Sequence, residues 1–94
     1  MHVGVCTINL CILESRSLKD KRRVIKSVID RVKNRFNVSI AEVRLQNAYQ
    51  SAVIGVVSVS GDQHHLNKVL SHVVAFVEKI HLVELVDYKI ELAY

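Results

Sequence analysis

The spacing of apolar residues changes along this chain in an order that few folds can accommodate. Stretches that alternate every second residue are typical of strands, and stretches with a spacing of three to four residues are typical of helices. The expected elements, in chain order, are residues 2–13, 18–35, 37–44, 51–60, about 63–80 and 83–92. The pattern therefore predicts the order strand, helix, strand, strand, helix, strand.

The four predicted strands differ in polarity, and this difference predicts their places in the sheet. Residues 2–13 and 51–60 are apolar on both faces, whereas residues 37–44 and 83–92 are more polar and carry charges. Strands buried on both faces lie in the middle of a sheet, and charged strands mark its edges. The ferredoxin-like α+β sandwich meets these demands, because its antiparallel sheet has the order 4-1-3-2 with both helices on one face. Residues 1–94 should form one such domain, since no Pro-, Gly- or Ser-rich linker interrupts them.

A single helical layer leaves the other face of the sheet uncovered. The residues expected there are mostly apolar: Val5, Thr7, Asn9, Cys11, Ala41, Val43, Ile54 and Val56. Exposure of such a face to water is unfavourable, and a second copy of the same chain is the partner that most often buries it. We therefore predict a homodimer whose contact face includes Val5, Thr7, Ile54 and Val56. The alternative for Ile54 is that it faces the helices instead.

The predicted helix at 18–35 concentrates the positive charge of the chain. Residues 16–35 carry nine basic and two acidic side chains, whereas residues 45–94 carry three basic and five acidic ones. Ser17 is a favourable N-cap, and Asp20 stands where a capping box places its acidic residue. The candidate binding residues form a stripe opposite the apolar face: Lys19, Arg22, Arg23, Lys26 and Lys33.

The first two turns of this helix, with Lys19, Lys21, Arg22 and Arg23, are cationic where the helix dipole favours carboxylates. Helix stability alone does not explain that choice. The stripe suits a polyanion such as RNA or a ribosomal particle, held through its phosphates. The alternative is a solvated helix face with no nucleic-acid role, partly balanced by Asp20 and Asp30.

The residue patterns of enzymes and metal sites are absent. The chain has no glycine-rich phosphate loop, nucleophile elbow or Cys-x-x-Cys pair. His65 and His72 share a helix face but would lie about 10 Å apart, too far for one zinc ion. The two central strands also lack the aromatic residues on which RNA-recognition motifs stack bases. We expect no enzymatic activity, no metal and no cofactor. The remaining alternative is an anion-binding enzyme of an unrecognised type.

The apolar opening of the chain is predicted to be a strand. It lacks a charged leader region and is interrupted by Thr7 and Asn9 well short of a membrane-spanning length. Cys6 and Cys11 lie five residues apart on that strand, so they point to opposite faces and cannot pair with each other. Both are expected to be reduced thiols in the core of a cytoplasmic protein that does not enter a membrane.

Two segments resemble a known bacterial family. The run SLKDKR at 17–22, with RFNVSIAEV at 35–43, is similar to the YlxP-like proteins, a domain of unknown function. The resemblance extends over nearly the whole chain and implies a ferredoxin-like fold with no assigned catalytic residues. Genes of this family lie beside those for translation initiation factor two and ribosome-binding factor A in several bacteria, which implies a link to ribosomes or translation. Tyr49 departs from the family pattern, which often has tryptophan or histidine near this position, and we expect it to pack on its hairpin.

Overall fold

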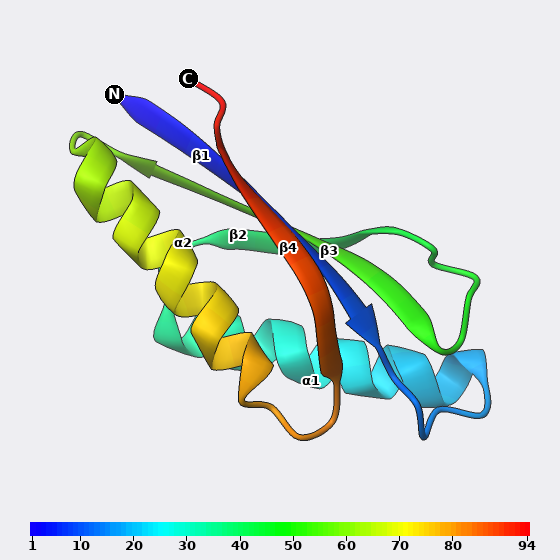
Figure 1. Ribbon diagram of the computed structural model, residues 1–94. Coiled ribbons are helices and arrows are strands. Elements are labelled where there is room, and N and C mark those ends of the chain that lie inside the picture. Colours follow the sequence, from blue (N-terminus) through cyan, green and yellow to red (C-terminus); the bar gives the residue numbers. More distant parts are fainter.

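The computed structural model describes residues 1–94 and contains four strands and two helices (Figure 1). The elements are β1 (His2–Cys11), α1 (Leu18–Arg35), β2 (Ser39–Arg44), β3 (Ser51–Ser60), α2 (Gln63–Glu78) and β4 (Glu84–Leu92). The predicted order is confirmed, and the bounds of α1 and β3 agree with the expected ones. The other four elements are one or two residues shorter at one end.

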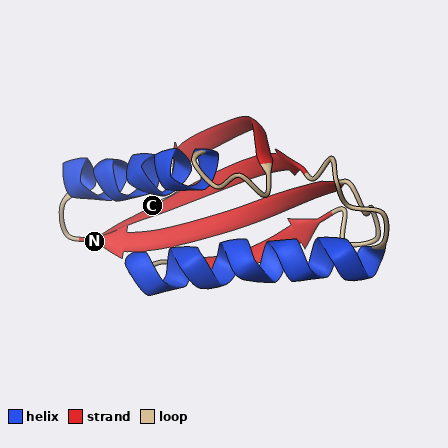
Figure 2. Cartoon of the chain, turned by 90° about the horizontal axis from the view of Figure 1, so that it is seen from below, coloured by secondary structure: helices blue, strands red, loops and turns tan.

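The sheet is antiparallel with the order β2-β3-β1-β4, so the ferredoxin-like topology is confirmed. The central pair β1 and β3 is in register over ten residue pairs, from His2 opposite Ser60 to Cys11 opposite Ser51. Both helices lie against one face of this sheet (Figure 2). The more polar strands β2 and β4 form the two edges, as their charge predicts.

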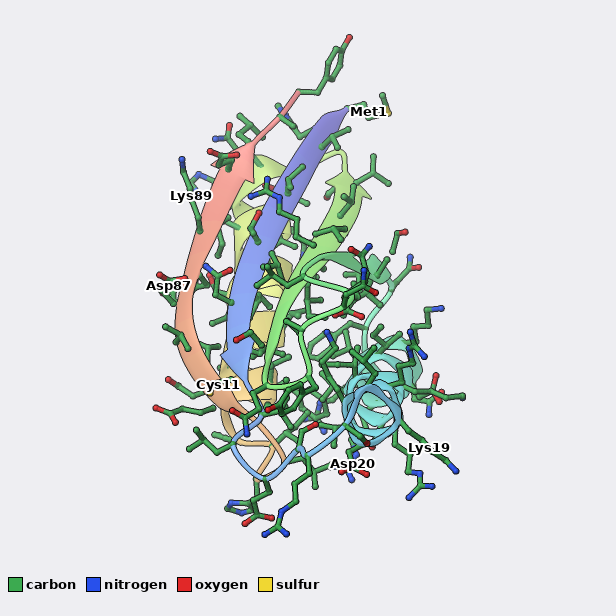
Figure 3. The ribbon with its side chains drawn as sticks, turned by 90° about the vertical axis from the view of Figure 1, so that its right-hand side faces the viewer. Met1, Cys11, Lys19, Asp20, Asp87 and Lys89 are labelled. Carbon is green, nitrogen blue, oxygen red and sulfur yellow. The ribbon has the colours of Figure 1, made fainter.

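The core lies between the sheet and the two helices. Figure 3 shows α2 behind the sheet and α1 nearly end-on beside it. From β1 the core receives Cys6, Ile8, Leu10 and Ile12, from α1 Ile25, Val28 and Val32, and from α2 Leu66, Leu70, Val73 and Val77. Full burial of each such aliphatic side chain stabilises the fold by about 1.5–3 kcal/mol. This core fixes the rotation of α1, and therefore which of its residues face solvent.

Two glycines of the sheet, Gly4 and Gly55, allow neighbouring side chains to approach the backbone closely. A Cβ atom on Gly4 would lie 2.7 Å from Cδ1 of Leu70, so this glycine lets α2 pack closely on β1. A Cβ atom on Gly55 would lie 2.9 Å from Cγ1 of Val43, where an irregularity in β2 shifts its register against β3.

Neither helix is long and apolar enough to cross a membrane.

Candidate nucleic-acid interface

The local structure at Ser17 fixes where α1, which carries the basic stripe, begins. Ser17 has extended backbone angles, and its hydroxyl oxygen accepts a hydrogen bond from the backbone N–H of Asp20 at 3.1 Å. The Asp20 carboxylate in turn accepts from the backbone N–H of Arg16 at 3.1 Å. The predicted N-cap is therefore confirmed, and the carboxylate of Asp20 is occupied with backbone rather than with the stripe.

The stripe consists of Lys19, Arg22, Arg23, Lys26 and Lys33, and all five side chains are exposed. They lie on the side of α1 that faces away from the core, and Figure 3 shows Lys19 pointing outward from the start of the helix. The positions from 19 to 33 extend over about 21 Å at the rise of an α-helix. The fold thus places all the predicted stripe residues on one solvent-facing side.

One stripe cation is neutralised by a neighbour on the helix. The ammonium of Lys26 lies 2.8 Å from the carboxylate of Asp30. The hydrogen bond to Asp30, and then its negative charge, raise the pKa of Lys26 above its ordinary value. No other cation of the stripe has an ion pair within the chain. Four of the five stripe charges are therefore free to meet an external anion.

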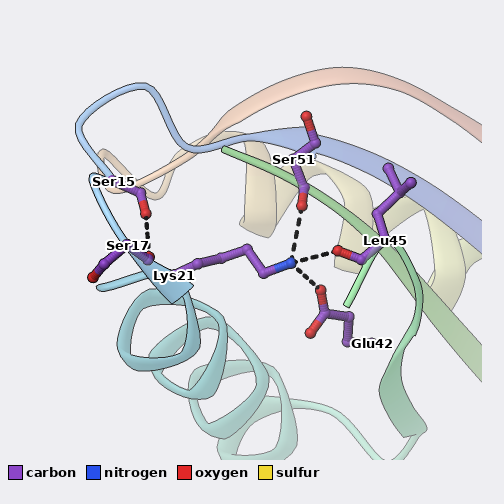
Figure 4. Close-up of polar contacts among 6 residues, drawn as sticks. All are labelled: Ser15, Ser17, Lys21, Glu42, Leu45 and Ser51. Carbon is purple, nitrogen blue, oxygen red and sulfur yellow. Dashed lines mark hydrogen bonds and ion pairs between the residues drawn. The ribbon is translucent and has the colours of Figure 1, made fainter. Parts of the chain in front are cut away.

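Lys21 differs from every other cation of the helix because it is fully buried, with 0% of its side chain exposed. Its ammonium lies 2.8 Å from Oε2 of Glu42 and donates hydrogen bonds to the carbonyl oxygens of Leu45 at 2.6 Å and Ser51 at 3.1 Å (Figure 4). Two of the three N–H donors of the ammonium are therefore used by carbonyl oxygens, and the Glu42 carboxylate compensates the positive charge as an ion pair. Lys21 joins α1 to both ends of the loop between β2 and β3.

The grouping of Lys21 with the cationic surface was wrong, although the sequence contains the signal that places it inside. Lys21 follows Leu18 by three residues and precedes Ile25 by four, so it belongs to the apolar side of the helix. Glu42 follows Ile40 by two residues and shares its face of the strand. A basic residue and an acidic residue on two buried faces together indicate an internal ion pair.

The chain is similar to known proteins over most of its length. The family described as "Protein of unknown function (DUF503)" matches residues 3–90. The chain belongs to this family. It is 35% identical over 82 residues to the "Uncharacterized protein YlxP" of Bacillus subtilis (strain 168), which covers 87% of this chain and 89% of that protein. The YlxP-like resemblance is thus confirmed. Because neither description assigns an activity, the function of this DUF503 protein has to be argued from its own surfaces.

The uncovered sheet face contains only part of the predicted set. Val5 and Thr7 lie on it, half-buried. Ile54 and Val56 were placed there wrongly, because they pair with Ile8 and Cys6 and are buried against the helices. Since β3 is apolar on both faces, alternation alone cannot tell which set of residues faces the helices. The β3 residues on the uncovered side are Val53, Gly55, Val57 and Val59.

The remaining candidate groups lie apart from the stripe. No group of three or more His, Cys, Asp or Glu side chains is arranged to hold a metal ion. Cys6 is buried in the core, and burial raises the pKa of its thiol to about 11. Cys11 is half-buried on the other face of β1, so only Cys6 is a core thiol. Tyr49 lies in the loop between β2 and β3 and is 48% exposed, so it does not pack fully on its hairpin.

Proposed function

We propose that this protein is a non-enzymatic, cytoplasmic binding protein that attaches to RNA, free or in ribosomal particles, through the basic stripe of α1. The observation that supports the proposal is the exposure of all five stripe cations on one side of a helix, with only Lys26 neutralised. Lys19, Arg22 and Arg23 also stand in the first two turns, where they oppose the helix dipole. A charge pattern that the helix does not need for stability suits an external polyanion.

The dimensions of the stripe fit a nucleic-acid backbone. The stripe extends over about 21 Å, which is long enough to meet several successive phosphates of one strand. Five cations on one side of a helix can neutralise roughly three to five of them. Because the contacts are to phosphates, binding should not depend on base sequence. The logarithm of affinity plotted against the logarithm of salt concentration should then have a slope of roughly −2 to −4.5.

The test uses two triple variants with equal loss of charge. The stripe variant replaces Lys19, Arg23 and Lys26 by glutamine, which keeps helix propensity while removing three charges. The control variant replaces Arg44, Lys68 and Lys89, three exposed cations outside α1, in the same way. Binding of both to a labelled RNA is measured by fluorescence anisotropy over a range of salt concentrations.

The proposal predicts that the stripe variant binds at least tenfold more weakly and shows a flatter salt slope, whereas the control keeps most of its affinity. The melting temperature of the stripe variant should be unchanged or slightly higher, because cations near the helix start are unfavourable. Equal losses in the two variants would show attraction by net charge alone. Absence of binding by the wild type at low salt would leave the solvated helix face as the correct interpretation.

A second candidate function, assembly into a homodimer, is favoured by the uncovered sheet face. On this face Val57 is 39% exposed and Val59 is 60% exposed. The edge strand β4 adds Asp87, Lys89 and Glu91 on the same side, opposite β1 residues of the uncovered face. In a two-fold dimer each copy offers the same surface to the other, so charges of both signs can pair across the axis.

Light scattering tests this assembly. The wild type should have twice the mass of one chain, and Val57→Glu should shift it towards the monomer because a carboxylate would be buried at the contact. Asn67→Glu, an equal change of charge on the exposed side of α2, should leave the mass unchanged. A wild-type monomer at high micromolar concentration would contradict the dimer.

A further inference from the structure

The two helices enclose a groove that the basic stripe does not include. It has a volume of about 710 Å³ and lies between the C-terminal half of α1, the C-terminal half of α2 and the residues that follow α2. This volume is within the usual range for sites of small ligands. Its lining residues are Arg31, Arg35, His72, Ala75, Phe76, Lys79, Ile80, His81 and Leu82.

The lining divides into a basic part and an apolar part. Arg31, Arg35 and Lys79 supply three permanent positive charges, and none of them has an ion pair within the chain. No Asp or Glu side chain lines the groove. A ligand that matches it must therefore carry negative charge, and guanidinium groups are well suited to phosphate because they can donate two parallel hydrogen bonds.

The apolar part favours a flat ring beside that charge. The guanidinium carbon of Arg35 lies 5.2 Å from the centroid of the Phe76 ring, so the cation is stacked over the aromatic side chain. Phe76 also meets Phe36 edge to face, with 5.6 Å between ring centroids, which holds the ring in place. Guanidinium planes and aromatic rings are the surfaces on which proteins stack unpaired bases.

From these observations we propose that the groove binds one nucleotide, with its base against Phe76 and the stacked Arg35 and its phosphate on Arg31 and Lys79. The nucleotide can be free or can belong to a single-stranded RNA, and only the second case rests on the proposed function of the stripe. Arg31 and Arg35 lie on the flank of α1 that faces α2, beside the stripe. A strand held along α1 could thus place one unstacked base in the groove.

Ala75 offers a probe that leaves the core unchanged. It is exposed, lines the groove and lies on α2, so Ala75→Glu puts a negative charge and added bulk into the site. Asn67→Glu is the matched control, since it makes the same change of charge about 12 Å away on the same helix. Arg31→Gln, which removes a charge from the phosphate end, gives a second variant with a small effect on packing.

The binding of four probes is measured by calorimetry or anisotropy. These are adenosine 5′-monophosphate, hexyl phosphate, a single-stranded RNA and an abasic strand of the same length. Ala75→Glu and Arg31→Gln should each weaken binding of the nucleotide or of the RNA at least tenfold, and Asn67→Glu should weaken it less than twofold. Binding of the free nucleotide identifies a mononucleotide site, whereas an effect seen with RNA alone identifies a base of the strand.

Three results would overturn the nucleotide assignment. Hexyl phosphate binding as tightly as the nucleotide would show an aliphatic phosphate site. Equal affinity for the abasic strand and the RNA would show that no base binds in the groove. Equal effects of Ala75→Glu and Asn67→Glu would show charge repulsion at a distance. In each case a loss of RNA binding in the stripe variant would still support the proposed function, so the two proposals fail separately.

Discussion

Replacing Lys21 by methionine should strongly destabilise the protein, although methionine is also unbranched and has a similar volume. The ammonium is fully buried and has three partners, the Glu42 carboxylate and the carbonyl oxygens of Leu45 and Ser51. Oε2 of Glu42 is buried and makes no hydrogen bond of ordinary geometry, so the ammonium at 2.8 Å is its one close polar partner. Methionine would leave this negative charge unpaired.

The size of the loss follows from what remains buried. Removing one member of a buried ion pair costs about 3–5 kcal/mol, because the other charge is left without compensation. Since 15% of the Glu42 side chain is exposed, water can partly solvate it. We therefore expect a loss near the lower limit, about 3 kcal/mol, which corresponds to a fall of roughly 12–24 °C in the melting temperature of a domain of this size.

A double-mutant cycle in urea is the assay. Lys21→Met and Glu42→Leu should each cost about 3 kcal/mol, whereas the double variant should cost less than either, because no buried charge remains. The double variant still loses the hydrogen bonds to the two carbonyl oxygens, so a remaining cost of about 1–2 kcal/mol is expected. Lys19→Met is the control on the exposed side of α1 and should change stability by less than about 0.5 kcal/mol.

Two outcomes would refute this reasoning. A cost below about 1 kcal/mol for Lys21→Met would mean that the ammonium contributes little beyond its stem. Additive losses in the double variant would mean that Lys21 and Glu42 do not interact in solution. The slope of the unfolding free energy against urea concentration has to be the same in all variants for the comparison to hold.

Three further predictions concern the helix cap, the faces of β1 and the contact of α2 with the sheet. Ser17→Ala should lower the free energy of unfolding by about 1 kcal/mol in a denaturant titration, since it removes the acceptor for the Asp20 N–H. A loss below roughly a few tenths of a kcal/mol would contradict the assignment of Ser17 as N-cap. Iodoacetamide should label Cys11 in the native protein and Cys6 only after unfolding, as read by mass spectrometry, because Cys6 is buried and its pKa of about 11 keeps the thiol protonated at neutral pH. Gly4→Ala should cost about 1–3 kcal/mol through overlap with a leucine of α2, whereas Gly61→Ala, with open space around it, should be nearly neutral in thermal unfolding.

The order of the elements, the sheet topology and the exposed stripe could all be predicted from the pattern of residues. Local rules are sufficient for these features. Ser17 starts α1 because its hydroxyl caps a nearby amide, and the spacing of Ile25, Val28 and Val32 sets which side of the helix is buried. Once the apolar side of α1 is known, the direction of Lys19 and Lys26 follows from the geometry of the helix.

The face of β3 that meets the helices could not be predicted from the pattern of residues. The neighbours Val53 and Ile54 point to opposite faces of β3, and both are apolar and buried. Hydropathy therefore does not distinguish the two faces of the strand. The choice is made by pairing with β1, where Ile54 stands opposite Ile8 and so shares its side of the sheet. The register of two paired strands depends on residues that are far apart in the chain, so the local periodicity of one strand does not determine it.

The ion pair of Lys21 and the groove between the helices also depend on tertiary packing. Lys21 meets Glu42 because α1 lies across β2, and Arg31 faces Lys79 across the groove because both helices cover the same side of the sheet. A charge is tolerated in the interior only where partners converge on it, and these partners come from three separate segments. The sequence contains each residue, but only the packed chain brings them together.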